Sequence, residues 1–202
     1  MAVNLLQSEE TKEQKASSKP VLTFDLDGIL CAPILGLNIG INRSFLAPEV
    51  APLTANIPPD WWRIIWDKIR FDSRRPMSDV TEYLEQLQSH YALILVTGRR
   101  TSPNNWLQRN GLFGYFSEVI WNTSEFQSAH YKLNTLNALH PVAHFEDDPR
   151  TAELLARSGV TVFLRDWPKN RNLHFNNQVI RIFSLKDASE SLSKLNQKQQ
   201  GD

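Results

Sequence analysis

Two aspartates, Asp25 and Asp27, follow a hydrophobic run in the stretch VLTFDLDGIL and are separated by one residue, with Gly28 directly after them. Two like charges this close raise each other's pKa and cost stability unless a cation or a buried partner compensates. Carboxylates act as nucleophiles, as general acids and bases, and as oxygen ligands of Mg²⁺. The pattern therefore indicates a site in which a cation or a buried partner offsets the two charges.

Other polar residues end later hydrophobic runs in the same manner. Thr97 follows the run in LILVTGRR, and Asp147 and Asp148 follow the run in HFEDDPR. In an open parallel sheet, ligands bind outside the carboxyl ends of the strands. We therefore expect Thr97, Asp147 and Asp148 to converge with Asp25 and Asp27 on one edge, although they are far apart in the sequence.

Short apolar runs rich in β-forming residues predict the strands that would position these side chains. They alternate with segments of helical period, which implies right-handed crossovers and a mainly parallel sheet with helices on both faces. The predicted fold class is therefore α/β and Rossmann-like. The predicted strands are Val21–Phe24, Ala92–Val96, Glu118–Trp121, Val142–Phe145, Val160–Leu164 and Val179–Phe183.

Several segments between these runs carry helix signals. In SDVTEYLEQLQSH, apolar residues recur at i, i+3, i+4 and i+7, and Ser78 is placed as the N-cap. In TSPNNWLQRNG, Ser102 can cap a helix, Pro103 suits its first turn and Gly111 can end it. The segment DPRTAELLARSG ends on Gly159 in the same way.

Length, charge and cysteine content narrow the class of protein. The 202 residues fit one domain, over residues 20–192, with disordered tails at 1–19 and 193–202. A formal net charge of zero implies no broad basic face, which argues against nucleic acid as a partner. Cys31 is the only cysteine, which excludes an internal disulfide and favours the cytoplasm. No apolar run approaches the ~20 residues of a membrane span.

Residues 31–76 interrupt the alternation of strands and helices. This stretch is rich in proline and contains PPDWWRIIWDKIR, in which one helical stripe would be formed by Trp62, Ile65, Trp66 and Ile69. An insertion this long exceeds what a connection between a strand and a helix needs. It predicts a small cap over the carboxyl ends of the strands, or else a helix that only packs on the core.

The order of these motifs resembles that of the haloacid dehalogenase superfamily. Its phosphatases have DxDG after the first strand, Thr or Ser after the second, then a Lys, and an acidic pair after the fourth strand. The matching residues here are Asp25-Leu26-Asp27-Gly28, Thr97-Gly98, Lys132 in HYKLNTL, and Asp147-Asp148, within residues 20–185. The resemblance implies Mg²⁺-dependent hydrolysis of a small phosphomonoester through an aspartyl-phosphate intermediate.

The resemblance also implies a role for each acidic residue. Asp25 would be the nucleophile, and Asp27 would protonate the leaving oxygen and later activate water. Mg²⁺ would be held by Asp25, by the backbone carbonyl of Asp27, and by Asp148 with or without Asp147. Of the last two, Asp148 is favoured because a helix begins directly after it.

The remaining motif residues would bind the phosphate. Thr97 and the Gly98 amide would donate to phosphate oxygens, and Lys132 would neutralise charge near the nucleophile. Each has a structural alternative, because Thr97 can cap a helix that begins near Ser102 and Lys132 can simply be solvated. Glu146 is interpreted as a residue that flanks the acidic pair.

The substrate prediction depends on two stretches, FLRDWPKNRN and FEDDPR, which look similar to the deoxyribonucleotidase branch of the superfamily. That branch removes phosphate from nucleoside monophosphates beneath a small helical cap, where Trp residues of the insertion could stack on a base. Arg99, Arg43 and Arg63 are candidates for substrate contact, and each is also interpretable as an ordinary surface arginine.

Other function classes remain open. The chain could be a binding or regulatory protein on a phosphatase-like scaffold, although such a protein has no physical reason to retain Asp25 beside Asp27. A phosphoacceptor receiver domain carries its acceptor after the third strand, where this sequence has VIWNTSE without an Asp. Transfer of the phosphoryl group to an acceptor other than water stays open, as does the oligomeric state.

Overall fold

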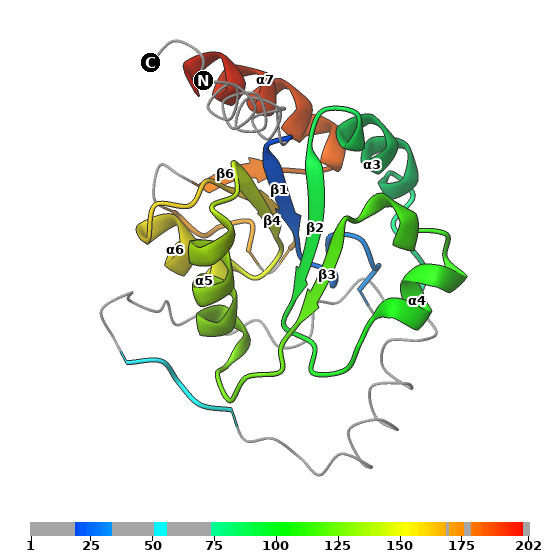
Figure 1. Ribbon diagram of the computed structural model, residues 1–202. Helices are drawn as coiled ribbons and strands as arrows, with labels where there is room; N and C mark the ends of the chain where they lie inside the picture. The colour runs from blue at the N-terminus through cyan, green and yellow to red at the C-terminus, as the bar shows by residue number, and fades with distance from the viewer. Residues whose placement is uncertain (1–18, 34–50, 56–73, 169, 176–178, 200–202) are drawn as a thin grey trace, which may run out of the picture.

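A parallel sheet forms the centre of the computed structural model, which describes residues 19–33, 51–55, 74–168, 170–175 and 179–199 (Figure 1). The six strands lie in the order β3-β2-β1-β4-β5-β6, and every neighbouring pair is parallel. The predicted α/β, Rossmann-like fold is therefore confirmed. The strands are β1 (Val21–Phe24), β2 (Ala92–Thr97), β3 (Glu118–Trp121), β4 (Ala143–Glu146), β5 (Val162–Arg165) and β6 (Val179–Ile182).

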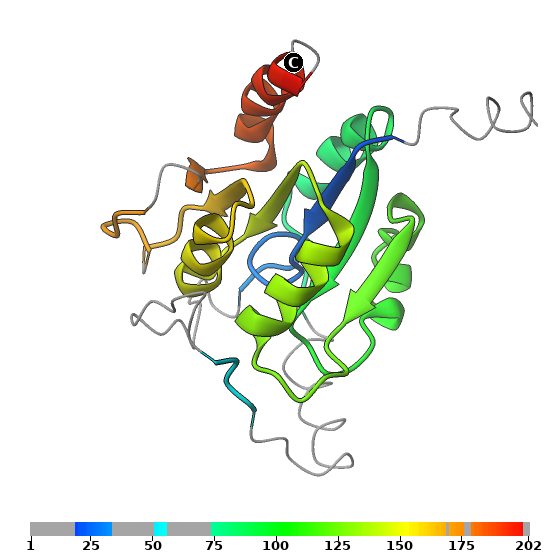
Figure 2. The same ribbon diagram turned by 60° about the vertical axis from the view of Figure 1, so that its left-hand side comes forward.

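Helices cover both faces of this sheet, as Figures 1 and 2 show. The apolar side chains of α3, α4 and α7 belong to one core, and those of α5 and α6 belong to the other. Lys132 of the HYKLNTL stretch lies within α5. The helices are α3 (Val80–Gln88), α4 (Asn104–Arg109), α5 (Ser128–Leu139), α6 (Pro149–Arg157) and α7 (Leu185–Gln199), with a 3₁₀ turn η2 (Phe113–Tyr115).

Several predicted boundaries differ by one or two residues, and the one at β4 matters for the site. The strand predicted at Val142–Phe145 is Ala143–Glu146, so that Glu146 is the last residue of β4 rather than part of the following loop. The N-cap position of α3 is Asp79 and not Ser78. The Asp79 carboxylate accepts a hydrogen bond from the Leu185 amide at 2.9 Å, so it joins the start of α3 to the start of α7.

The core beneath α3, α4 and α7 is built on stacked aromatic rings. Phe24 of β1 and Phe145 of β4 are register partners, and their rings stack with centroids 4.4 Å apart. Phe163 of β5 extends the row, with its centroid 5.0 Å from that of Phe145. Each such ring, fully buried, stabilises the fold by roughly 1.5–3 kcal/mol. These rings hold the three central strands in register, and thereby fix the height at which their carboxyl ends meet.

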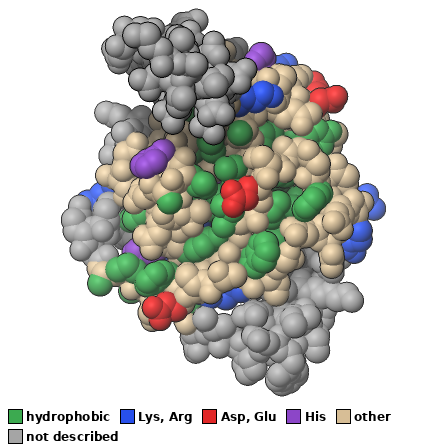
Figure 3. All heavy atoms as spheres, viewed as in Figure 1, with side chains coloured by type: hydrophobic (Ala, Val, Ile, Leu, Met, Phe, Trp, Pro, Cys, Tyr) green, Lys and Arg blue, Asp and Glu red, His purple; other side chains and the backbone are tan. Residues whose placement is uncertain are grey.

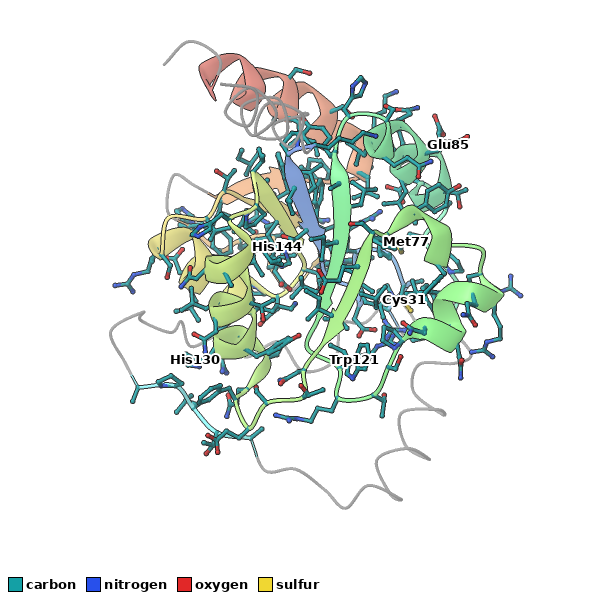
Figure 4. All side chains as sticks on the ribbon, in the orientation of Figure 1. Cys31, Met77, Glu85, Trp121, His130 and His144 are labelled. Atoms are coloured by element: carbon teal, nitrogen blue, oxygen red, sulfur yellow. The ribbon has the colours of Figure 1, made fainter. Side chains whose placement is uncertain are left out.

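The two ends of the predicted insertion lie side by side. The Ala32 amide donates to the Arg75 carbonyl and the Met77 amide donates to the Leu30 carbonyl, each at 2.9 Å. Cys31 and Met77 are accordingly neighbours in Figure 4. The small cap predicted over residues 31–76 remains a prediction, because the stripe of Trp62, Ile65, Trp66 and Ile69 lies outside the described residues.

The segment 51–55, drawn in cyan in Figure 1, pairs with the loop between β3 and α5. The Ala55 amide donates to the Glu125 carbonyl at 2.9 Å, and the Gln127 amide donates to the Leu53 carbonyl at 2.8 Å. Because this loop follows the carboxyl end of β3, the segment lies at the sheet edge where a ligand site is expected.

Charged side chains of both signs are scattered over the described part of the face shown in Figure 3. Hydrophobic side chains lie between them. Among the described helices, none is both long enough and apolar enough to cross a bilayer.

Candidate active site

The carboxyl ends of β1, β2 and β4 bring the predicted residues to one edge of the sheet. Asp25 follows β1, and its amide donates to the Phe145 carbonyl at 2.8 Å, so that the end of β1 is tied to the end of β4. Thr97 is the last residue of β2 and is buried. The convergence expected from the sequence is therefore present for Asp25, Thr97 and Asp147.

Asp25 is paired with a lysine inside the protein. Lys132 Nζ, on α5, lies 2.9 Å from Asp25 Oδ1, and both side chains are buried. Burial raises the pKa of Asp25 to about 7, with the nearby Glu146 and Asp27 carboxylates adding to the rise and Lys132 opposing it. Burial alone would lower the pKa of Lys132, but the two carboxylates Asp25 and Glu146 outweigh it and raise that pKa. Lys132 is thus charged at neutral pH, and the alternative that it is merely solvated is wrong.

Glu146 is part of the site and not a flanking residue. Its Oε2 accepts from Lys132 Nζ at 2.7 Å, and its Oε1 accepts from the amides of Asp147 and Asp148 at 3.1 and 3.0 Å. The Glu146 side chain is fully buried, and Lys132 holds its pKa below the ordinary value although burial opposes this. A glutamate in a buried strand is rarely unpaired. If the predicted strand had been extended to Glu146, the sequence would have indicated that this glutamate has a buried partner.

The two aspartates of the acidic pair differ in what their side chains do. Asp148 is the N-cap of α6, and its carboxylate accepts from the Arg150 and Thr151 amides at 3.3 Å and from Thr151 Oγ1 at 2.7 Å. Asp147, in contrast, offers a carboxylate oxygen that clusters with oxygens of Asp25 and Glu146, all within 4.8 Å of one another. The geometry therefore favours Asp147 over Asp148 as the residue that faces Asp25. Asp followed by Pro149 at N1 is an N-cap signature that the sequence already contained.

Gly28 allows this approach for two reasons. Its φ of +77° lies in the left-handed region, which glycine adopts at little cost. A Cβ at this position would lie 2.0 Å from Asp147 Oδ2 and 2.5 Å from Asp147 Cγ. A side chain at position 28 would therefore displace the Asp147 carboxylate from the site.

Asp27 is held by two arginines. Arg99 donates from Nε to Asp27 Oδ2 at 2.9 Å and from Nη2 to Oδ1 at 2.7 Å, and Arg74 Nη1 donates to Oδ1 as well. Burial alone would raise the pKa of Asp27, but the hydrogen bonds and charges of Arg99 and Arg74 outweigh it and lower that pKa. Asp27 is therefore ionised in this conformation. Arg99 was predicted to contact the substrate, whereas Arg74 belongs to no motif in the sequence.

Thr97 and Gly98 lie where β2 ends, against the start of α5. A Cβ on Gly98 would lie 2.0 Å from Ser128 Oγ, so only glycine leaves room for the first residue of α5. Thr97 Oγ1 accepts from the Arg99 amide at 3.3 Å. The alternative that Thr97 caps a helix is wrong, because α4 begins at Asn104 with Pro103 at its N-cap. Two other predicted contacts, Arg43 and Arg63, lie outside the described residues.

The end of β5 and the loop after it brace both acidic loops. Asn170 is buried and donates from Nδ2 to the Asp147 carbonyl at 3.2 Å. Trp167 Nε1 donates to the Gly28 carbonyl at 3.3 Å, and Arg165 Nη1 donates to the Ile29 carbonyl at 3.2 Å. This loop is the FLRDWPKNRN stretch of the sequence. Its side chains hold the backbone next to the site through these hydrogen bonds. None of these side chains was identified as a site residue from the sequence pattern.

The sequence matches no protein-family model and no curated protein. The fold, however, superposes on solved structures of haloacid dehalogenase-like hydrolases. One from Xanthomonas campestris has a TM-score of 0.60 at 12% identity, over 93% of this chain and 100% of that one. Another from Streptococcus pneumoniae has a TM-score of 0.58 at 14% identity, over 86% and 98%. A third, described as a predicted phosphoglycolate phosphatase from Haemophilus somnus, has a TM-score of 0.55 at 16% identity, over 88% and 99%.

This chain has the haloacid dehalogenase fold. The fold that the motif resemblance implies is thereby confirmed. The deoxyribonucleotidase branch remains a prediction.

Within the haloacid dehalogenase fold, the acidic cluster has the donor set of a magnesium site. Mg²⁺ prefers carboxylate and carbonyl oxygens and retains several waters. Asp25 and Asp147 supply carboxylates, and Gly28 keeps open the approach that Asp147 needs. Both oxygens of Glu146 already accept hydrogen bonds from within the protein. The residues present therefore fit Mg²⁺ on Asp25 and Asp147, with Glu146 as their support.

Proposed function

We propose that the protein is a phosphatase that hydrolyses a small phosphomonoester through an aspartyl-phosphate on Asp25. The observation that carries the proposal is the buried Asp25 carboxylate, 2.9 Å from Lys132 Nζ and within 4.8 Å of an Asp147 oxygen. A buried carboxylate with a cation on one side and a second acid on the other suits a nucleophile that works beside a metal.

Mg²⁺ would be held by Asp25, the Asp27 backbone carbonyl and Asp147, with Asp148 fixing the loop as the α6 N-cap. When bound, the metal would offset the charges of the carboxylates and orient the phosphate towards Asp25. From the sequence, Asp148 was preferred to Asp147 as the metal ligand. This assignment reverses that preference, because the Asp148 carboxylate accepts hydrogen bonds from amides of α6.

In the first half-reaction, an Asp25 oxygen attacks phosphorus and the bond between phosphorus and the ester oxygen breaks. Lys132 neutralises charge beside the nucleophile, while the Thr97 hydroxyl and the Gly98 amide donate to phosphate oxygens. Protonated Asp27 gives its proton to the leaving oxygen, so that an alcohol departs. Splitting the reaction in this way suits phosphate monoesters, whose uncatalysed hydrolysis is exceptionally slow.

In the second half-reaction, water attacks phosphorus, passes a proton to ionised Asp27, and the bond between phosphorus and Asp25 breaks. Inorganic phosphate is released and Asp25 is restored. Arg99 and Arg74 stabilise the ionised form of Asp27 that this step needs. For the first half-reaction Asp27 must take up a proton, which requires it to loosen its contacts with the two arginines.

A nucleoside monophosphate is the substrate class that we carry forward from the sequence. Its support is the resemblance of the FEDDPR and FLRDWPKNRN stretches to the deoxyribonucleotidases. The second of these contributes Asn170 and Trp167, which bind the backbone beside Asp147 and at Gly28.

The test is phosphate release from an aryl phosphate and from a panel of nucleotides and sugar phosphates, with and without Mg²⁺. We expect wild type to need Mg²⁺, and Asp25→Asn to lose at least about 10³-fold in kcat because the nucleophile is removed. Asp187→Asn is the matched control, since Asp187 caps α7 through the Phe183 and Ser184 amides, on an element outside the site. Equal rates for Asp25→Asn and wild type would contradict the proposal. Folded wild type that releases phosphate from no compound would favour the regulatory alternative.

A further inference from the structure

Polar side chains lie where the sheet is expected to be apolar. A parallel sheet covered on both faces normally presents Val, Ile and Leu to its helices. Thr23 of β1 and His144 of β4 are register partners at the centre of this sheet, and both are fully buried. They lie on the face covered by α5 and α6, where their register partners on the flanking strands are Ile94 and Val162 (Figure 4 labels His144).

These two residues begin a chain of hydrogen bonds that ends at the candidate nucleophile. Thr23 Oγ1 lies 2.9 Å from His144 Nδ1, and His144 Nε2 lies 3.2 Å from Glu146 Oε2. Glu146 Oε2 in turn accepts from Lys132 Nζ at 2.7 Å, and Lys132 Nζ lies 2.9 Å from Asp25 Oδ1. Every member of the chain is buried.

The chemistry of the partners sets the direction of each bond. Ionised Glu146 can only accept, so His144 Nε2 carries the proton that is donated to it. Burial lowers the pKa of His144, and the imidazole is therefore neutral at pH 7. Nδ1 of a neutral ring with a proton on Nε2 is an acceptor, so it accepts from the Thr23 hydroxyl. The Thr23–His144 pair thus fixes one tautomer and one orientation of the ring.

Glu146 connects this chain of hydrogen bonds to two parts of the candidate site. One of its oxygens faces Lys132 and His144, and the other accepts from the amides of Asp147 and Asp148 at 3.1 and 3.0 Å. A rotation of the Glu146 carboxylate would therefore move both the lysine beside Asp25 and the backbone that carries Asp147.

We propose that His144, oriented by Thr23, is a positioning residue that fixes Glu146 and, through it, Lys132 and the Asp147 loop at Asp25. The inference rests on the proposed function, in which Lys132 and Asp147 act on the Asp25 site. His144 is given no direct contact with substrate or metal in this proposal. Its contribution is to hold a buried carboxylate in one orientation, which a leucine of similar size cannot do.

Three variants at this site separate positioning from packing. His144→Leu removes the donor to Glu146, whereas His144→Gln keeps an amide N–H at similar reach. We expect His144→Leu to lower kcat by ~10–100-fold, which is the typical loss of activity when a residue that supports metal ligands is removed. KM should change less than about twofold. His144→Gln should recover most of that loss. Thr23→Val, which leaves the ring itself in place, should have an effect of only a few fold.

Val162→Ala is the matched control for stability. Val162 is the register partner of His144 on β5 and is fully buried on the same face. Its side chain takes no part in the series of hydrogen bonds from Thr23 to Asp25. Its truncation destabilises the fold but should leave kcat of the folded protein unchanged. Thermal unfolding of all four variants is measured alongside the kinetics. If His144→Leu kept the wild-type kcat, or Val162→Ala lost as much, the positioning role would be wrong.

Calorimetric Mg²⁺ binding to each variant separates this inference from the proposed function. Because it needs no turnover, it reports the arrangement of Asp25 and Asp147 even if no substrate is cleaved. We expect His144→Leu to bind Mg²⁺ about tenfold more weakly than wild type, and His144→Gln to bind nearly as well. An inactive wild type with this pattern would remove the proposed function but retain the positioning role. Unchanged Mg²⁺ affinity in His144→Leu, or no Mg²⁺ binding by wild type, would overturn the inference.

Discussion

The same two strands carry contrasting residues on their two faces. On one face, Phe24 of β1 stacks on Phe145 of β4 with centroids 4.4 Å apart. One residue earlier along each strand, on the other face, Thr23 lies 2.9 Å from His144 Nδ1. Phenylalanine rings gain stability mainly by burial, which is non-directional. A buried imidazole gains little unless its bonds are made, but then fixes a direction.

The contrast indicates that the two faces of the sheet have different roles. The aromatic face holds the strands together, and the polar face orients the groups at their carboxyl ends. Changes on the aromatic face should therefore act on the free energy of unfolding. Substitutions at the carboxyl end of the polar face should instead change the Mg²⁺ affinity and kcat of the site.

The largest effect is expected from Phe163→Ala on the aromatic face. Phe163 is fully buried and is the third ring of the row, and its side chain has no polar atom with which to bond the candidate site residues. Removing it should lower the free energy of unfolding by about 3–5 kcal/mol, through lost burial and the cavity left behind. Chemical denaturation measures this change.

At a temperature where the Phe163→Ala protein is still folded, kcat and Mg²⁺ affinity should stay within about twofold of wild type. A large fall in kcat without a matching loss of stability would show that the aromatic face also orients the site, and the proposed division would not hold.

An intermediate effect is expected from Gly28→Ala at the end of β1. The new Cβ would meet the Asp147 carboxylate at 2.0 Å, so Asp147 must move away from Asp25. We expect Mg²⁺ affinity to fall by ~10–100-fold, as measured by calorimetry.

Gly111→Ala provides the matched control for Gly28→Ala. Gly111 also has a positive φ, of +68°, but an added Cβ there has no neighbour within 4 Å. Both variants carry the backbone strain of roughly 1–2 kcal/mol for a side chain in the left-handed region. Gly111→Ala should therefore lose stability and keep its Mg²⁺ affinity. Equal affinities in the two variants would mean that Asp147 is not a ligand.

The sequence predicted which side chains meet at the candidate site better than it predicted the residues that support them. Asp25 and Thr97 were found because they lie at the ends of predicted strands, and Lys132 was found because its place in the order of motifs resembles known motifs. The role of Glu146 was missed because the strand was ended one residue early. In a strand, a residue's face depends on alternation, and extending β4 by one residue places Glu146 on the same face as His144.

Other roles depend on contacts that are distant in the sequence. Arg74 meets Asp27 because the ends of the insertion lie together, and His144 meets Thr23 because β1 pairs with β4 across a gap of 121 residues. No local pattern encodes either contact. The choice between Asp147 and Asp148, in contrast, was readable, because an Asp before Pro149 is a typical N-cap.

The smallest of the expected effects is a pH dependence of metal binding, and it sharpens the contrast between the faces. The aromatic rings do not titrate, whereas burial raises the pKa of Asp25 to about 7 in the metal-free protein. Below pH 7 Asp25 is mostly protonated, so Mg²⁺ must displace that proton in order to bind. Affinity should therefore rise with pH, by about tenfold between pH 6 and pH 8, since one proton displaced gives a factor of ten per pH unit below the pKa.

Calorimetry in two buffers of different ionisation enthalpy also counts the proton directly. Close to one proton should be released at pH 6 and close to none at pH 8.5, because Asp25 is already ionised at the higher pH. Phe163→Ala should show the same proton release as wild type, since the aromatic face leaves the environment of Asp25 unchanged. Equal affinity at pH 6 and pH 8, with no proton released at either, would mean that Asp25 is ionised before the metal arrives. Lys132 would then determine its charge more strongly than burial does.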